Sequence, residues 1–105
     1  MMTITVLAIL EPDPIPAPPL AKVMNERLKR LANELEHELS RSMDEIDSEC
    51  EDLVVYISYN SKYTIRWKIV NDVPPKIEAE VARQCANLGY NLWKGSTIYN
   101  FNARN

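Results

Sequence analysis

The spacing of apolar residues changes along the chain, and these changes constrain the fold more than any other feature of the sequence. From residue 20 onward, apolar side chains recur at steps of three and four. This stripe consists of Leu20, Met24, Leu28, Leu31, Leu35, Leu39, Met43 and Ile46. Because successive residues of an α-helix turn by about 100°, these side chains share one side of a helix. We predict one amphipathic helix over residues 20–48. A break at residues 40–42 is the alternative, since Ser42 and Glu45 match a capping box.

Alternating patterns lie on both sides of this helix. Residues 1–10 contain a run that is apolar on both faces and rich in β-branched residues, which predicts a buried central strand. Residues 53–70 hold two alternating runs around a short polar segment, which predicts a β-hairpin. Residues 11–19 contain five of the seven prolines. We interpret them as a stiff connector, with a proline-rich ligand as the alternative.

The last third of the chain predicts a second helix and a final β element. Apolar residues at helical spacing indicate a helix over residues 74–88, with Gly89 suited to its C-terminal end. Residues 90–101 indicate one strand or a tight hairpin of two. The order within a single domain of residues 1–105 is then β-α-β-β-α-β. This order is typical of a ferredoxin-like α+β fold, with an antiparallel sheet and two helices on one of its faces.

The sequence offers little catalytic or metal-binding chemistry. Cys50, Cys85 and the one histidine, His37, cannot complete a four-ligand zinc site without carboxylates. The Glu34-x-x-His37 pair lacks the second histidine that a di-iron bundle needs. Two glycines are too few for a phosphate-binding loop. We therefore expect no catalytic residue, no metal and no cofactor, and an inert thiol at Cys85 on the apolar side of its helix.

The charge of the chain is unevenly distributed. The net charge is −3, but residues 1–52 hold twelve acids against five bases. The predicted long helix is basic at its start and acidic at its end, which opposes the helix dipole. Such local violations are expected where a surface serves a function, although a merely solubilising surface is the alternative. The candidate partner-binding residues, which we call the acidic stretch, are Glu34, Glu38, Arg41, Asp44, Glu45 and Glu49.

Two binding functions follow from these surfaces. The acidic stretch favours a non-enzymatic protein-binding module or inhibitor that docks on a basic partner, such as a complex that handles nucleic acid. Small phage-encoded inhibitors that mimic nucleic acid use this strategy. The alternative is single-stranded nucleic-acid binding by basic and aromatic residues on an uncovered sheet face. Its candidate residues are Tyr56, Arg66, Lys68, Trp93 and Tyr99. A homodimer interface over Tyr56 and Trp93 would explain the same aromatic residues.

The sequence contains no membrane or secretion signal. The apolar run at residues 4–10 is far shorter than the roughly 20 residues that span a bilayer. It also lacks the basic region and cleavage site of a signal peptide. We therefore expect a cytoplasmic protein with reduced thiols and no membrane partner.

Overall fold

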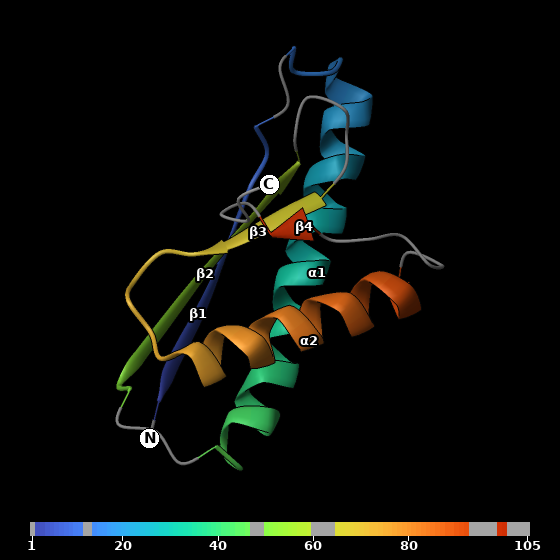
Figure 1. Ribbon diagram of the computed structural model, residues 1–105. Coiled ribbons are helices and arrows are strands. Elements are labelled where there is room, and N and C mark those ends of the chain that lie inside the picture. Colours follow the sequence, from blue (N-terminus) through green and yellow to red (C-terminus); the bar gives the residue numbers. More distant parts are fainter. Residues whose placement is uncertain (1, 12–13, 47–49, 60–64, 93–98, 101–105) are drawn as a thin grey trace.

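The computed structural model describes residues 2–11, 14–46, 50–59, 65–92 and 99–100 (Figure 1). Of residues 90–92 and 99–100, it describes the backbone alone. The elements, in chain order, are β1 (Thr3–Ile9), α1 (Pro18–Met43), β2 (Asp52–Tyr59), β3 (Ile65–Ile69), α2 (Pro75–Leu92) and the two-residue β4 (Tyr99–Asn100). Two helices and a mixed sheet confirm the predicted α+β class.

The sheet has the strand order β1-β2-β3-β4. β1 pairs with β2 in parallel, from Thr3 opposite Asp52 to Ile9 opposite Ser58. β2 and β3 pair in antiparallel fashion, which confirms the predicted hairpin. β4 adds a short parallel pairing at the other edge of β3.

The ferredoxin-like arrangement is not confirmed. In that fold β3 lies between β1 and β2, and the sheet is antiparallel. Here β1 pairs directly with β2 along its whole length, so β3 can occupy only the other edge of β2. The same pairing places β1 at the edge of the sheet, and the prediction of a central strand is therefore wrong. The order of elements along the chain does not specify which strands become neighbours.

The first helix is shifted toward the N-terminus relative to its prediction. It begins at Pro18, because prolines are tolerated in a first turn that needs no amide donors. It ends at Met43 rather than at residue 48. The Glu45 N–H donates to the Ser42 carbonyl at 3.2 Å, and the Ile46 N–H donates to the Met43 carbonyl at 3.1 Å. The backbone thus closes into a tight turn that contains Asp44 and Glu45.

The second helix is longer than its prediction. It continues from Pro75 past Gly89 to Leu92, since a glycine inside a helix costs only about 1 kcal/mol. Residues 90–92 are therefore helical, contrary to the predicted strand or hairpin over 90–101. Within that span residues 99–100 form β4, and residues 93–98 and 101 lie outside the described residues.

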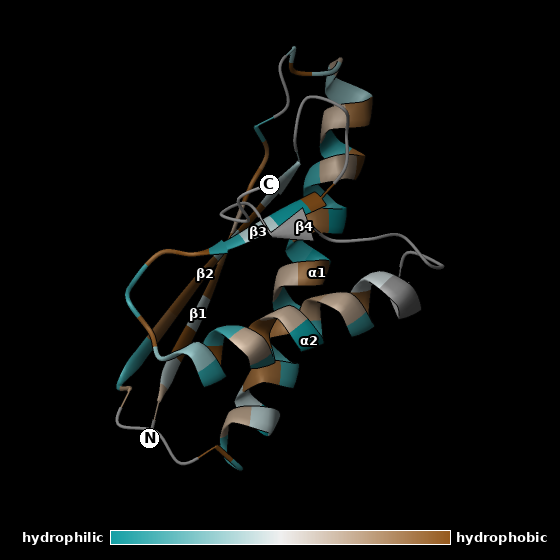
Figure 2. Cartoon of the chain, viewed as in Figure 1, coloured by the Kyte–Doolittle hydropathy of each residue, from teal (hydrophilic) through white to brown (hydrophobic). Residues whose placement is uncertain are grey.

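The helices cover one face of the sheet (Figure 1). The β2 residues on that face, Leu53, Val55 and Ile57, are completely buried, whereas Val54 and Tyr56 on the other face are partly exposed. Leu28, Leu31, Leu35 and Leu39 of α1, together with Ile77, Val81 and Cys85 of α2, complete the interior at 0–1% exposure. Figure 2 shows hydrophobic and hydrophilic residues distributed around both helices, as expected of helices buried on one side.

No helix in the described part of the chain is long and apolar enough to cross a membrane.

Candidate docking surfaces

Charge is graded along α1. Four basic residues lie in its first half, and acidic residues dominate from Glu34 onward. The 26 residues of this helix span about 39 Å, close to the longest extent of the molecule, 44 Å. The charge gradient of α1 therefore extends over most of the length of the molecule.

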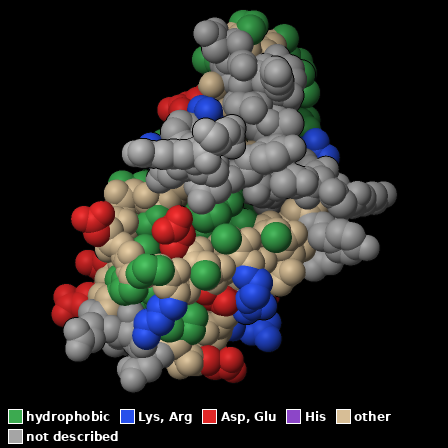
Figure 3. All heavy atoms as spheres, viewed as in Figure 1, with side chains coloured by type: hydrophobic (Ala, Val, Ile, Leu, Met, Phe, Trp, Pro, Cys, Tyr) green, Lys and Arg blue, Asp and Glu red, His purple; other side chains and the backbone are tan. Residues whose placement is uncertain are grey.

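The end of α1 and the starts of β2 and α2 lie toward one end of the molecule (Figure 1). These segments carry exposed carboxylates. Hydrogen bonds connect the segments at this end. The Thr3 N–H donates to the Glu51 carbonyl at 2.8 Å, and the Asn71 side-chain amide donates to the Asp52 carbonyl at 2.8 Å. We call the exposed carboxylates here the acidic end; they are Asp44, Glu45, Glu51, Asp52, Asp72 and Glu78. In Figure 3 several acidic side chains (red) lie along the left and lower margins of the view.

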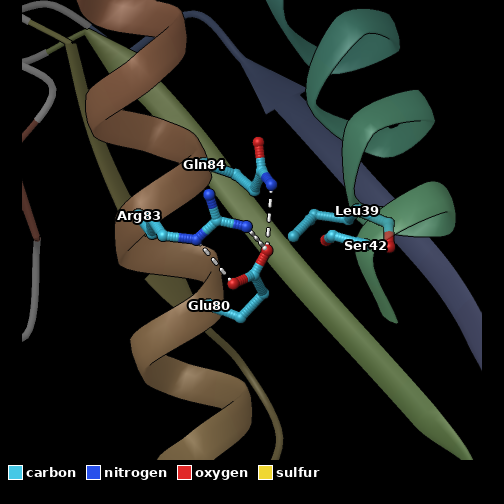
Figure 4. Close-up of polar contacts among 5 residues, drawn as sticks. All are labelled: Leu39, Ser42, Glu80, Arg83 and Gln84. Atoms are coloured by element: carbon cyan, nitrogen blue, oxygen red, sulfur yellow. Dashed lines mark hydrogen bonds and ion pairs between the residues drawn. The ribbon is translucent and has the colours of Figure 1, made fainter. Parts of the chain in front are cut away.

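Cations of the same molecule offset part of the negative charge near the acidic end. Arg41 donates to the Glu38 carboxylate at 3.4 Å. On α2, Arg83 holds Glu80 with two hydrogen bonds, of 2.8 and 2.6 Å (Figure 4). Glu80 and, to a lesser degree, Glu45 raise the pKa of Arg83. Arg83 therefore lies close enough to the acidic end to weaken its field on the α2 side.

The acidic stretch predicted from the sequence is divided by the fold. Glu34 and Glu38 are partly buried on α1, Arg41 is exposed on its last turn, and Asp44 and Glu45 are exposed in the turn after it. Glu49 lies outside the described residues. Of the predicted set, Asp44 and Glu45 thus belong to the acidic end. Glu51 and Asp52 also belong to the acidic run of the sequence, residues 34–52. Asp72 and Glu78 come from segments that a helical period cannot relate to α1, so sequence reasoning missed these two.

Glu36, a further acid of α1, points to β1 instead of toward a partner surface. Its Oε1 accepts a hydrogen bond from the Val6 N–H at 3.3 Å. Both residues are partly buried. This carboxylate therefore lies against the backbone of the edge strand.

A second candidate surface is the sheet face opposite the helices. Tyr56 lies opposite Lys68, and Ser58 lies opposite Arg66, across the β2–β3 pairing. The Lys68 Nζ lies 5.4 Å from the centre of the Tyr56 ring, and Arg66 Nε donates to Ser58 Oγ at 3.3 Å. Burial and a hydrogen bond to Glu11 raise the pKa of Tyr56.

The fold thus brings three of the five candidate nucleic-acid-binding residues onto one face. Tyr56, Arg66 and Lys68 are neighbours there. The backbone of Tyr99 pairs with that of Arg66 at the β3–β4 bridge. Trp93 lies outside the described residues.

The two cysteines differ in environment. Cys85 is 1% exposed, and burial raises the pKa of its thiol to about 12, which leaves it protonated and unreactive at neutral pH. Cys50 is partly exposed, and its thiol donates to the Asp52 carbonyl at 3.0 Å. Within the described residues, no three His, Cys, Asp or Glu side chains converge to hold a metal ion.

Comparison with protein-family models, with curated proteins and with solved structures finds no match to this chain.

Proposed function

We propose that this chain is a non-enzymatic protein-binding module, of the kind that inhibits its partner, and that the acidic end docks on a basic protein surface. The observation that carries the proposal is that six exposed carboxylates belong to segments that lie toward one end of the molecule (Figure 1). The C-terminal pole of α1 is negative and adds to their field, whereas the N-terminal pole of α2, whose first turn contains Glu78, is positive and offsets part of it. A complex that handles nucleic acid would offer a suitably basic surface.

Asp44 and Glu45, directly after the C-terminus of α1, have a folding cost that a binding role would explain. Negative charge at a helix C-terminus is unfavourable by roughly 0.3–1 kcal/mol per residue. Complementary potentials would in turn accelerate association with a basic partner and orient it.

We further propose that the protein acts in a reducing compartment such as the cytoplasm. Both Cys50 and Cys85 are free thiols, as is usual for cytosolic proteins.

A comparison of two charge variants tests the proposed docking. In the acidic-end variant, amides replace three carboxylates at nearly constant shape: Asp44→Asn, Glu45→Gln and Glu51→Gln. The matched control removes three charges from the first half of α1: Lys22→Gln, Lys29→Gln and Arg30→Gln. We expect that the wild type and the control capture the same basic protein from a host extract, identified by mass spectrometry, and that the acidic-end variant loses it. Equal capture by both variants contradicts the proposal.

Single-stranded nucleic-acid binding is a second candidate function, favoured by the shared position of Tyr56, Arg66 and Lys68 on the sheet face opposite the helices. Cations beside an aromatic ring are suited to phosphates and stacked bases. We expect an oligothymidine gel shift at low salt that Arg66→Glu with Lys68→Glu abolishes and the acidic-end variant retains. The absence of a shift even at low salt excludes this function.

A further inference from the structure

The outer edge of β1 is an unpaired strand edge of an unusual kind. Among the described residues, β1 is the first strand of the sheet order and pairs with β2 alone. Natural edge strands usually carry charges, prolines or bulges that prevent further pairing. The residues of β1, Thr3–Ile9, include neither a charge nor a proline. The strand therefore retains the capacity to pair on its outer side.

The hydrogen bonds between β1 and β2 show which N–H groups of β1 point to the outer edge. The Thr3 N–H bonds toward β2, at the Glu51 carbonyl. Because these groups alternate along a strand, the N–H groups of Ile4, Val6 and Ala8 point away from β2. Among the described residues, only Val6 of these three has a recorded acceptor, the Glu36 carboxylate at 3.3 Å. The outward N–H groups of Ile4 and Ala8 therefore have no hydrogen-bond acceptor among the described residues.

The exposure of the β1 side chains is also typical of a strand with no neighbour on one side. Ile4, Val6 and Ala8 on the helix-covered face are each only partly buried. On the other face, Leu7 is 43% exposed and Ile9 is 42% exposed. The adjacent core residues of β2 are completely buried. One more strand beside β1 would cover apolar surface on both faces.

We propose that an extended segment of a partner protein adds to the outer edge of β1 as a further strand, with a lysine or arginine beside Glu36. This site is distinct from the acidic end, because it uses the backbone of β1. The Glu36 carboxylate already lies at this edge, so it would attract a basic side chain on the incoming strand and repel an acidic one.

A segment without its own covering helix fits this edge better than a second copy of the chain. α1 lies closer to β1 than to β2. If β1 paired with β1 of a second copy, the two strands would lie about 5 Å apart, with an α1 helix over each. Packed helices need about 8–10 Å between their axes. The covering helices would therefore collide where both lie on one face of the joined sheet, whereas a lone strand brings no helix of its own.

Amide hydrogen exchange measured by NMR tests the proposal on the intact chain. The probe is a capped peptide of alternating valine and lysine, and its control has glutamate in place of lysine. At saturation, the lysine peptide should slow exchange at Ile4 and Ala8 about tenfold or more, and the glutamate peptide should have much less effect. The Val54 amide, which already donates to Asn71 Oδ1 at 3.0 Å, serves as the internal reference.

Three variants assign the effect to the edge. Val6→Pro removes an outward N–H without removing a bond to β2. It should abolish the slowing of exchange by the lysine peptide. The N–H of Leu7 points to β2, so Leu7→Ala should leave the slowing of exchange unchanged. Glu36→Gln should make the two peptides equivalent. The acidic-end variant should respond as the wild type does, which separates this site from the proposed function.

Several outcomes overturn the proposal. The wild-type measurement decides even if Val6→Pro fails to fold: unchanged exchange at Ile4 and Ala8 with saturating lysine peptide excludes the added strand. An equal effect of both peptides on the wild type excludes the role of Glu36. Protection of the same amides that rises with protein concentration, without peptide, shows that a second copy occupies the edge.

Discussion

At the scale of single residues, the stability of the fold depends on the leucines of α1. Leu35 is 1% exposed and lies in the core cluster that joins both helices to the sheet, whereas Leu20 is 50% exposed near the start of the same helix. Leu35→Ala should lower the free energy of unfolding by about 2–5 kcal/mol, because it leaves a cavity in the core. Leu20→Ala should change it by less than about 1 kcal/mol. Urea denaturation measures both, and similar losses would contradict the burial described here.

Tyr59 is a residue whose hydroxyl is unfavourable for folding. The side chain is 3% exposed, and within the described part of the chain its hydroxyl has no hydrogen-bond partner. Burial also raises the pKa of this phenol. A buried hydroxyl without a partner costs about 1–3 kcal/mol.

Tyr59→Phe should therefore leave the free energy of unfolding unchanged or raise it by about 1 kcal/mol. Thermal and urea unfolding measure the difference, with Tyr56→Phe, which removes a hydroxyl that bonds to Glu11, as the contrasting variant. A loss of more than about 1 kcal/mol in Tyr59→Phe would reveal an acceptor for this hydroxyl.

At the scale of elements, Glu80 connects α2 to α1. It accepts hydrogen bonds from Arg83 and from Gln84 Nε2 at 2.9 Å (Figure 4). Arg83 contributes most to lowering the pKa of Glu80 to about 2, with smaller contributions from Gln84 and from Ser42 of α1. The ordinary pKa of this side chain is 4.5. The ionised carboxylate is therefore favoured by the folded state.

This shift predicts an acid-sensitive contribution to stability. Because the folded-state pKa of Glu80 is depressed, its contribution is complete above pH 4.5 and is lost as the pH falls toward about 2. Glu80→Gln should lower the free energy of unfolding by about 1–2 kcal/mol at neutral pH, allowing for the solvent around Arg83. The difference from wild type should vanish near pH 2 in urea titrations. A deficit in Glu80→Gln that stays constant with pH would contradict this account.

The elements themselves could largely be predicted from the sequence, but their arrangement could not. The leucine stripe and the alternating runs predicted two helices and a hairpin, because side-chain periodicity follows directly from backbone geometry. Strand adjacency depends on pairing across the sheet, which periodicity does not record. The edge position of β1, despite a sequence typical of a central strand, therefore needed the structure. The end of α1 at Met43 also escaped prediction, since Ile46 still packs on the core beyond the helix.

At the scale of the whole molecule, the candidate docking site is a property of the folded chain. Asp44 and Glu45 follow from the acidic run of the sequence. Glu51 and Asp52 join them because β2 starts where α1 ends, and Asp72 joins through the Asn71 side chain, which bonds to the Asp52 carbonyl. Whether charges of separate elements lie near one another depends on the tertiary structure. The sequence therefore indicated an acidic surface on one helix, whereas the acidic end combines residues from several elements.

The measurement that tests the central proposal most directly is the dissociation constant of the captured basic protein, determined by calorimetry at low and physiological salt. The acidic-end variant should bind about tenfold or more weakly than wild type at low salt, with a smaller salt dependence, because each charge removed contributes a few tenths to about 1 kcal/mol. The control lacking Lys22, Lys29 and Arg30 should bind as tightly as wild type or more tightly. Equal dissociation constants and equal salt dependence for wild type and the acidic-end variant would contradict docking through the acidic end.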